Sequence, residues 1–213
     1  MNGDLFAHSA LNRSIDALRS DLLDEQGPKI STMRNYRFAI LQYVPKDEFI
    51  LRDRIRWLTD ELKGQGWSIC SISLQQLLLD RLKQQEPKVL ESWRRMEQRL
   101  YEKDRHRALN YIKEKISQQL EGPNGIAQDV IQIVGEFSEK LQGDDGKVLI
   151  LLGRAGALYP FLRSSAMLKH LDGKTYNLPV VLLYPGERDG LTGLRFMGEL
   201  QPDRDYRPRI YSQ

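Results

Sequence analysis

The sequence has a single cysteine, Cys70, among its 213 residues, which excludes a disulfide framework and a zinc site built from four thiolates. It also has no apolar run near the roughly 18 residues that a membrane-spanning helix needs, and its N-terminus lacks the apolar core of a signal peptide. The net charge of +3 is too small for a protein that holds nucleic acid through overall charge alone. We therefore expect a cytoplasmic protein that makes no contact with a membrane.

Nucleotide-binding and metal-binding motifs are missing as well. The Gly-Lys-Thr triplet at 173–175 has Leu168 where a P-loop needs its leading glycine, and it follows a predicted helix instead of a strand. No Gly-x-Gly-x-x-Gly exists, and the three histidines lie far apart without other ligands at metal-binding spacing. The pair Asp144–Asp145 precedes a strand, where solvation of a loop is more usual than metal binding. The sequence thus assigns no catalytic, cofactor-binding or metal-binding residue and predicts a protein that is not an enzyme.

Apolar runs of strand length alternate with amphipathic helices along the chain. Strands buried on both faces predict an α/β fold with a mainly parallel sheet covered by helices. This topology is similar to that of P-loop ATPases without a Walker A loop, and we expect a single domain over 1–213. Ligands of such sheets bind outside the carboxyl ends of the strands, where the loops beginning at Pro45, Ser73, Gly153 and Pro185 are expected. The predicted strands are 37–44, 67–72, 148–152, 178–184 and 194–197.

Residues 86–120 have a different pattern, with two helical stripes offset by a break near 101–106. This predicts a helical pair or one long bent helix, inserted into the α/β domain. Residues 86–115 hold nine basic and six acidic residues, whereas the rest of the chain is balanced. Such a segment is either an ordinary solvated helix face or a contact face for nucleic acid or an acidic partner. The arginines that would form this face are Arg94, Arg95, Arg99 and Arg105.

A glycine-flanked arginine, Arg154, leaves the end of the most apolar strand, 148–152, and a helix is predicted to follow it as far as His170. The backbone amides of that helix start can hold an anion with help from Arg154. Glycines in this position equally serve close packing of a helix on a strand. Both interpretations stay open from the sequence.

The C-terminal third carries several distinctive segments. They are Gly-Arg-Ala-Gly-Ala-Leu-Tyr-Pro-Phe at 153–161, a strand ending in Tyr-Pro-Gly at 184–186, Leu-Arg-Phe at 194–196, and a tail Tyr-Arg-Pro-Arg-Ile-Tyr at 206–211. In this combination, and in length, the whole chain resembles the BrxB family of BREX phage-defence systems. The resemblance implies a small accessory protein of a multi-component system that methylates host DNA and blocks phage replication. Its implied companions are a phosphatase-like PglZ protein, an adenine methyltransferase and a large ATPase.

The resemblance makes a non-catalytic adaptor that binds the PglZ protein the leading hypothesis. A DNA-binding component acting through 86–115 is the alternative, and a phosphate or nucleotide enzyme using Arg154 is a third hypothesis. Arginine and tyrosine are enriched at interface hot spots, so we predict that they form the partner-binding surface. The predicted partner-binding residues are Arg154, Tyr159, Arg195, Tyr206, Arg207, Arg209 and Tyr211.

Overall fold

A computed structural model describes residues 2–30, 37–141, 146–162, 164–190, 193–199 and 208–212. Within these residues the strands form one sheet in the order β2-β3-β4-β1-β6, with parallel pairing throughout. A further strand, β5, pairs antiparallel with the distal part of β4. The strands are β1 (Phe38–Tyr43), β2 (Ser68–Ser73), β3 (Val148–Gly153), β4 (Val180–Asp189), β5 (Gly193–Phe196) and β6 (Arg209–Tyr211).

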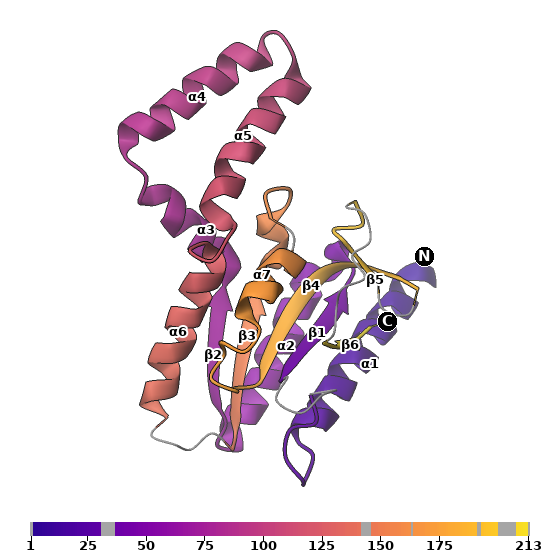
Figure 1. Cartoon of the computed structure of the whole chain (residues 1–213). Helices are drawn as coiled ribbons and strands as arrows, with labels where there is room; N and C mark the ends of the chain where they lie inside the picture. Colours follow the sequence, from indigo (N-terminus) through magenta and orange to yellow (C-terminus); the bar gives the residue numbers. More distant parts are fainter. Residues whose placement is uncertain are drawn as a thin grey trace.

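Helices cover both faces of the sheet (Figure 1). Helices α1 and α2 pack on one face, and α3, α6 and α7 pack on the other. The prediction of an α/β fold with a mainly parallel sheet flanked by helices is therefore confirmed. The helices are α1 (Asn2–Leu22), α2 (Glu48–Gly64), α3 (Leu74–Lys83), α4 (Pro87–Tyr101), α5 (Arg105–Leu120), α6 (Ile126–Lys140) and α7 (Ser164–Leu171), with short 3-10 turns η1 (Pro45–Asp47) and η2 (Ala155–Leu158).

The central strands owe their burial to this two-sided covering. Every residue of β1 is buried, because successive side chains point to opposite faces of the sheet. Phe38 and Ile40 join the core formed with α3, α6 and α7, whereas Leu41 and Tyr43 join the core formed with α1 and α2. The same alternation makes β3 apolar throughout, which is why its sequence has no polar face.

The predicted turn at Pro185-Gly186 is wrong, since β4 continues through it to Asp189. Position 186 needs a glycine for this extension, because a Cβ atom there would clash with the carbonyl oxygen of Arg195 in β5, at only 2.3 Å. The close approach of β5 therefore needs a residue without a side chain. The structure also contains β6, a short strand near the C-terminus that the predicted strands do not include.

The helix predicted after Gly156 and through His170 is not continuous: α7 confirms its second half, whereas the 3-10 turn η2 and non-helical residues take the place of the first half. Tyr159 adopts extended backbone angles between η2 and α7, with φ −74° and ψ 137°. A proline disfavours helical angles in the residue before it and cannot donate a helical hydrogen bond, so Pro160 interrupts this segment.

Helices α4 and α5 form an antiparallel pair that projects beyond the end of the sheet (Figure 1). We call this pair the arm. Of the two shapes expected for 86–120, the pair is observed, because the helix ends at Tyr101 and a new one starts at Arg105. Asp104 begins the second helix by accepting hydrogen bonds from the backbone amides of His106 (2.9 Å) and Arg107 (3.2 Å).

Candidate functional site

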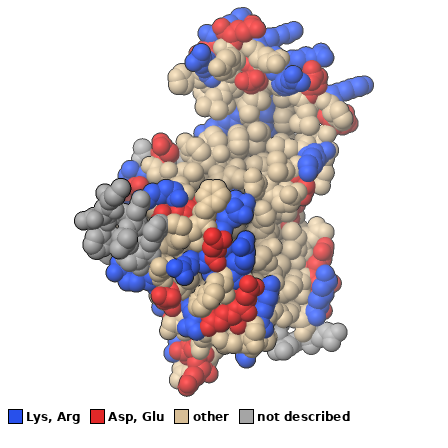
Figure 2. Space-filling model, turned by 180° about the vertical axis from the view of Figure 1, so that it is seen from behind, with Lys and Arg blue, Asp and Glu red and all other residues tan. Residues whose placement is uncertain are grey.

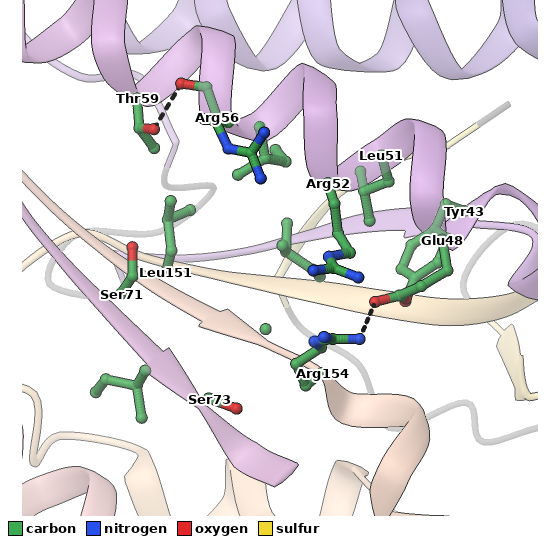
Figure 3. A pocket seen from close by; sticks show the side chains of 14 residues that line it. Tyr43, Glu48, Leu51, Arg52, Arg56, Thr59, Ser71, Ser73, Leu151 and Arg154 are labelled. Atoms are coloured by element: carbon green, nitrogen blue, oxygen red, sulfur yellow. Dashed lines mark hydrogen bonds and ion pairs between the residues drawn. The ribbon is translucent and has the colours of Figure 1, made fainter. Parts of the chain in front are cut away.

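A cleft of about 320 Å³ lies between α2 and the carboxyl ends of the strands (Figure 3). Strands β1 and β2 are three positions apart in the sheet, so the connecting helix α2 must cross the face over β4 and β3. At the edge, β2 contributes Ser71, Ile72 and Ser73 to the cleft lining, and the small serine side chains leave space beneath the helix. The cleft therefore occupies the position where parallel sheets bind ligands.

Arginines line both walls of this cleft. Arg52 and Arg56 lie one helical turn apart on α2, beside the apolar residues Leu51 and Ile55. Arg154 approaches from the opposite wall, at the end of β3 (Figure 3). Sequence reasoning identified Arg154 and missed the two arginines of α2. Their signal is a pair of cationic residues at i and i+4, each directly following a residue of the buried stripe.

Arg154 is held by a short chain of polar contacts. The hydroxyl of the fully buried Tyr43 donates a hydrogen bond to the Glu48 carboxylate, whose other oxygen lies 3.5 Å from an Nη atom of Arg154. Burial, together with the bond to Glu48, raises the pKa of Tyr43, so its hydroxyl remains a donor. Arg154 itself has left-handed backbone angles, with φ 62° and ψ 30°, which are uncommon for a residue with a side chain.

Residues from the four expected loop positions meet around Arg154, although α3 begins directly after β2 and β4 continues through Pro185. A second hollow, of about 270 Å³, is lined by Pro45, Gln75, Arg154, Gly156 and Pro185 among others. The helix start expected to bind an anion here is absent, however, because η2 is a 3-10 turn of four residues. The backbone part of that expectation is wrong, and what the structure supplies at this position is the guanidinium group.

The arm carries a separate hollow, an apolar groove of about 640 Å³ between α4 and α5. No residue of α4 is buried, so the hydrophobic side of this helix is only partly covered. Leu109 is 55% exposed and Tyr101 is 50% exposed. The apolar residues lining the groove are Leu82, Leu90, Trp93, Tyr101, Ala108, Leu109, Ile112 and Ile116.

The arm arginines do not form one continuous face. Arg94 and Arg105 line the groove, and the guanidinium of Arg105 lies 5.4 Å from the ring centre of Tyr101. Arg95 instead bonds to Glu91, one turn away on α4, at 3.0 Å. Arg99 is exposed on the same helix. Figure 2 shows basic and acidic side chains interleaved over the arm, at the top of the view.

The base of the arm is fixed by Arg81 of α3, a residue that sequence reasoning missed. Its guanidinium forms a two-point ion pair with Asp129 of α6. It also donates to the backbone carbonyls of Gln119 (3.0 Å), Asn124 (2.8 Å) and Gly125 (2.6 Å). One side chain therefore joins α3, the end of α5, the following turn and α6. The sequence gives no sign of this, because the carbonyl partners are defined only by the folded turn.

Part of the C-terminal tail binds to its own domain. Strand β6 pairs with β1, and Tyr211 is buried with its hydroxyl donating to Asp21 at 2.6 Å. Arg209 forms an ion pair with the same carboxylate at 2.6 Å and donates to the carbonyl of Lys29 at 3.0 Å. Both side chains thus hold β6 against α1, and their predicted role in partner binding stays a prediction.

The remaining predicted contact residues lie apart from one another. Tyr159 is half-buried, with its ring 6.4 Å from that of Phe196 on β5. Arg195 is half-buried on β5. Tyr206 and Arg207 lie outside the described residues, as does the acidic pair 144–145.

Comparison with known proteins identifies the family. The sequence profile described as "BREX protein BrxB" matches residues 70–210, about two thirds of the chain. The chain belongs to the BrxB family. A BREX protein BrxB from Bacillus cereus (strain H3081.97) is 29% identical to it over 199 residues, covering 88% of this chain and 94% of the relative. No solved structure matches.

Membership of the BrxB family implies involvement in a BREX phage-defence system. In the part of this BrxB protein that the structure describes, no helix has the length and apolar character to cross a membrane. The same residues contain no group of three or more His, Cys, Asp or Glu side chains arranged to hold a metal ion.

Proposed function

We propose that this BrxB protein is a non-catalytic adaptor of a BREX complex that binds a PglZ-like phosphatase-fold protein through the arm. The apolar groove between α4 and α5 carries the proposal. Soluble proteins rarely leave large apolar patches uncovered unless another protein covers them. Leu109, Tyr101 and Met96 are each more than 40% exposed along the arm. The methyltransferase and the large ATPase of the same system are further candidate partners.

An amphipathic helix with acidic flanks is the partner segment that fits this groove. Two antiparallel helices of about 15 residues form a groove roughly 22 Å long, which matches a helix of four turns. Arg94 and Arg105 at the groove offer ion pairs to acidic residues beside the apolar stripe of such a helix. The basic excess of residues 86–115 adds long-range attraction toward an acidic partner.

Co-purification with the PglZ protein, followed by size exclusion at micromolar concentration, tests the proposal. Leu109→Asp places a charge in the groove at an exposed position and is expected to weaken the complex at least about 10-fold. Leu79→Asp is the matched control, because Leu79 is also exposed (41%) but lies on α3 outside the groove. Separate elution of the two wild-type proteins, or an L109D complex as tight as that of L79D, would contradict the proposal.

DNA binding by the arm is the second candidate, and the basic excess of 86–115 favours it. It predicts a complex that weakens steeply with salt and is lost when Arg94, Arg95, Arg99 and Arg105 become Ala. Two observations favour the protein partner instead: Arg95 is already paired with Glu91, and the aromatic residues Trp93 and Tyr101 line a groove rather than a flat basic face. A mobility shift of duplex DNA at low salt that the four substitutions abolish would favour DNA binding over a protein partner.

A further inference from the structure

The cleft under α2 has an excess of positive charge. Among the described residues that line it, Arg52, Arg56 and Arg154 are cationic, and Glu48 alone is anionic. Arg52 and Arg56 reach into the cleft from α2, and Arg154 faces them from the end of β3 (Figure 3). Three guanidinium groups around one hollow, with one carboxylate, leave a surplus of two positive charges. That surplus matches a ligand group carrying two negative charges.

These guanidinium groups keep donors for a ligand, because their own ion pairs are loose. The Arg154–Glu48 and Arg56–Asp53 pairs are both 3.5 Å long, beyond the usual 2.7–2.9 Å of a charge-assisted hydrogen bond. Arg52 lies over the ring of Phe49 at 5.8 Å, and within the described residues no carboxylate is in ion-pair range of it. By contrast, Arg209 is bound to Asp21 at 2.6 Å. The cleft arginines therefore line the hollow while keeping hydrogen-bond donors that the protein itself does not fully use.

The floor of the cleft is apolar. Leu51 and Ile55 of α2 face Leu151 of β3 and Leu183 of β4. The hydroxyls of Ser71 and Ser73 lie along the edge formed by β2 (Figure 3). A volume of about 320 Å³ is at the small end of ligand-binding sites, which suits a compact organic body joined to a charged group.

We infer that this cleft binds a small organic phosphate monoester. The phosphate dianion lies among the guanidinium groups of Arg52, Arg56 and Arg154, and the organic body covers the apolar floor. The left-handed backbone of Arg154 agrees with this role, because residues with side chains that hold such angles cluster at ligand clamps. The inference concerns a different surface from the arm and is independent of the adaptor proposal.

Isothermal titration calorimetry at low ionic strength tests this inference with two probes, AMP and phenyl phosphate. We expect at least one ester to bind, and adenosine and inorganic phosphate to bind at least about 10-fold more weakly than it. Arg154→Gln and Arg52→Gln should each weaken ester binding about 10-fold or more, because each removes charge-assisted hydrogen bonds. Arg95→Gln is the matched control on the arm and should leave ester binding unchanged.

Three results would overturn the inference: no heat from either ester at millimolar concentration, equal binding of the ester and inorganic phosphate, or equal weakening by R95Q and R154Q. Arg52 is exposed on α2, so R52Q keeps the test decisive if R154Q fails to fold. R52Q, at a residue outside the predicted partner-binding set, should still bind the PglZ protein like the wild type. Failure of the inference about the cleft is therefore distinguishable from failure of the proposal about the arm.

Discussion

Replacing Arg81 with Met tests whether one side chain fixes the arm to the α/β domain. Its five hydrogen bonds join α3 to Asp129 and to three backbone carbonyls around the turn that follows α5. Met keeps much of the length and apolar volume of Arg but none of its donors. The variant therefore removes the bonds while largely preserving packing.

The magnitude follows from the burial of this pair. The side chains of Arg81 and Asp129 are 19% and 29% exposed, so water replaces only part of what is lost. Hydrogen bonds to charged groups contribute about 1.5–3 kcal/mol each, but bonds that share one side chain are not additive. We expect R81M to lower the free energy of unfolding by about 2–4 kcal/mol. For a chain of this size, that corresponds to a fall in Tm of about 5–15 °C.

Denaturant unfolding of R81M, D129N and the double variant measures the effect and isolates the ion pair. The cycle should give a coupling energy of about 1 kcal/mol or more between the two positions. Arg95→Met is the control, because its exposed pair with Glu91 contributes only about 0.3–0.5 kcal/mol. If R81M unfolds within about 0.5 kcal/mol of the wild type, the arm is not held by this residue and the reasoning fails.

Three further outcomes follow from the structure. Burial raises the pKa of the Cys70 thiol, so its reaction with a disulfide reagent at pH 8 should be slow in the native protein and fast after unfolding, and equal rates would contradict this. Burial also raises the pKa of Tyr43 and Tyr211, so both hydroxyls stay protonated at a pH where unfolded tyrosine ionises. The free energy of unfolding should therefore fall as the pH rises above about 10, and denaturant titrations at pH 9 and 11 measure this fall. A Cβ atom at Gly125 would lie 2.1 Å from a backbone oxygen, whereas one at Gly64 would meet nothing within 4 Å. Gly125→Ala should therefore lower the free energy of unfolding by more than about 2 kcal/mol, and Gly64→Ala should raise it by about 0.5–1 kcal/mol. The opposite order of Tm values would refute the packing argument.

The sequence predicted the parallel sheet because its signal is local. A strand buried on both faces must be apolar at every position, and 148–152 satisfies this without reference to any partner. The extension of β4 through Pro185 and Gly186 is different. These two residues are typical of a turn, and only the neighbouring strand β5 explains why they continue a strand here. Local propensity was overridden by a tertiary contact.

The residues of the candidate site show the same contrast between local signals and contacts made only by the fold. Arg154 was predicted because its glycine-flanked loop follows the most apolar strand directly in sequence. Arg52 and Arg56 were missed because they belong to the opposite wall, on α2, which only the fold places over the end of β3. In the tail, composition alone predicted a partner-binding role for Arg209 and Tyr211, and the fold adds contacts within the domain that the composition did not indicate. Composition gives the chemistry of a residue, and the fold decides which partner uses it.

Helix α3 connects the cleft with the arm, and its length bears on how variants at the two places should combine. Ser73 lines the cleft and caps the start of α3, whereas Arg81 near its end holds the base of the arm. A helix of 10 residues is about 15 Å long, which exceeds the 7–10 Å within which substitutions usually influence one another. The free-energy changes of R52Q in the cleft and L109D on the arm should therefore add in a double variant. A coupling well above 0.5 kcal/mol, in stability or in partner binding, would contradict this independence and show that the cleft and the arm are energetically coupled.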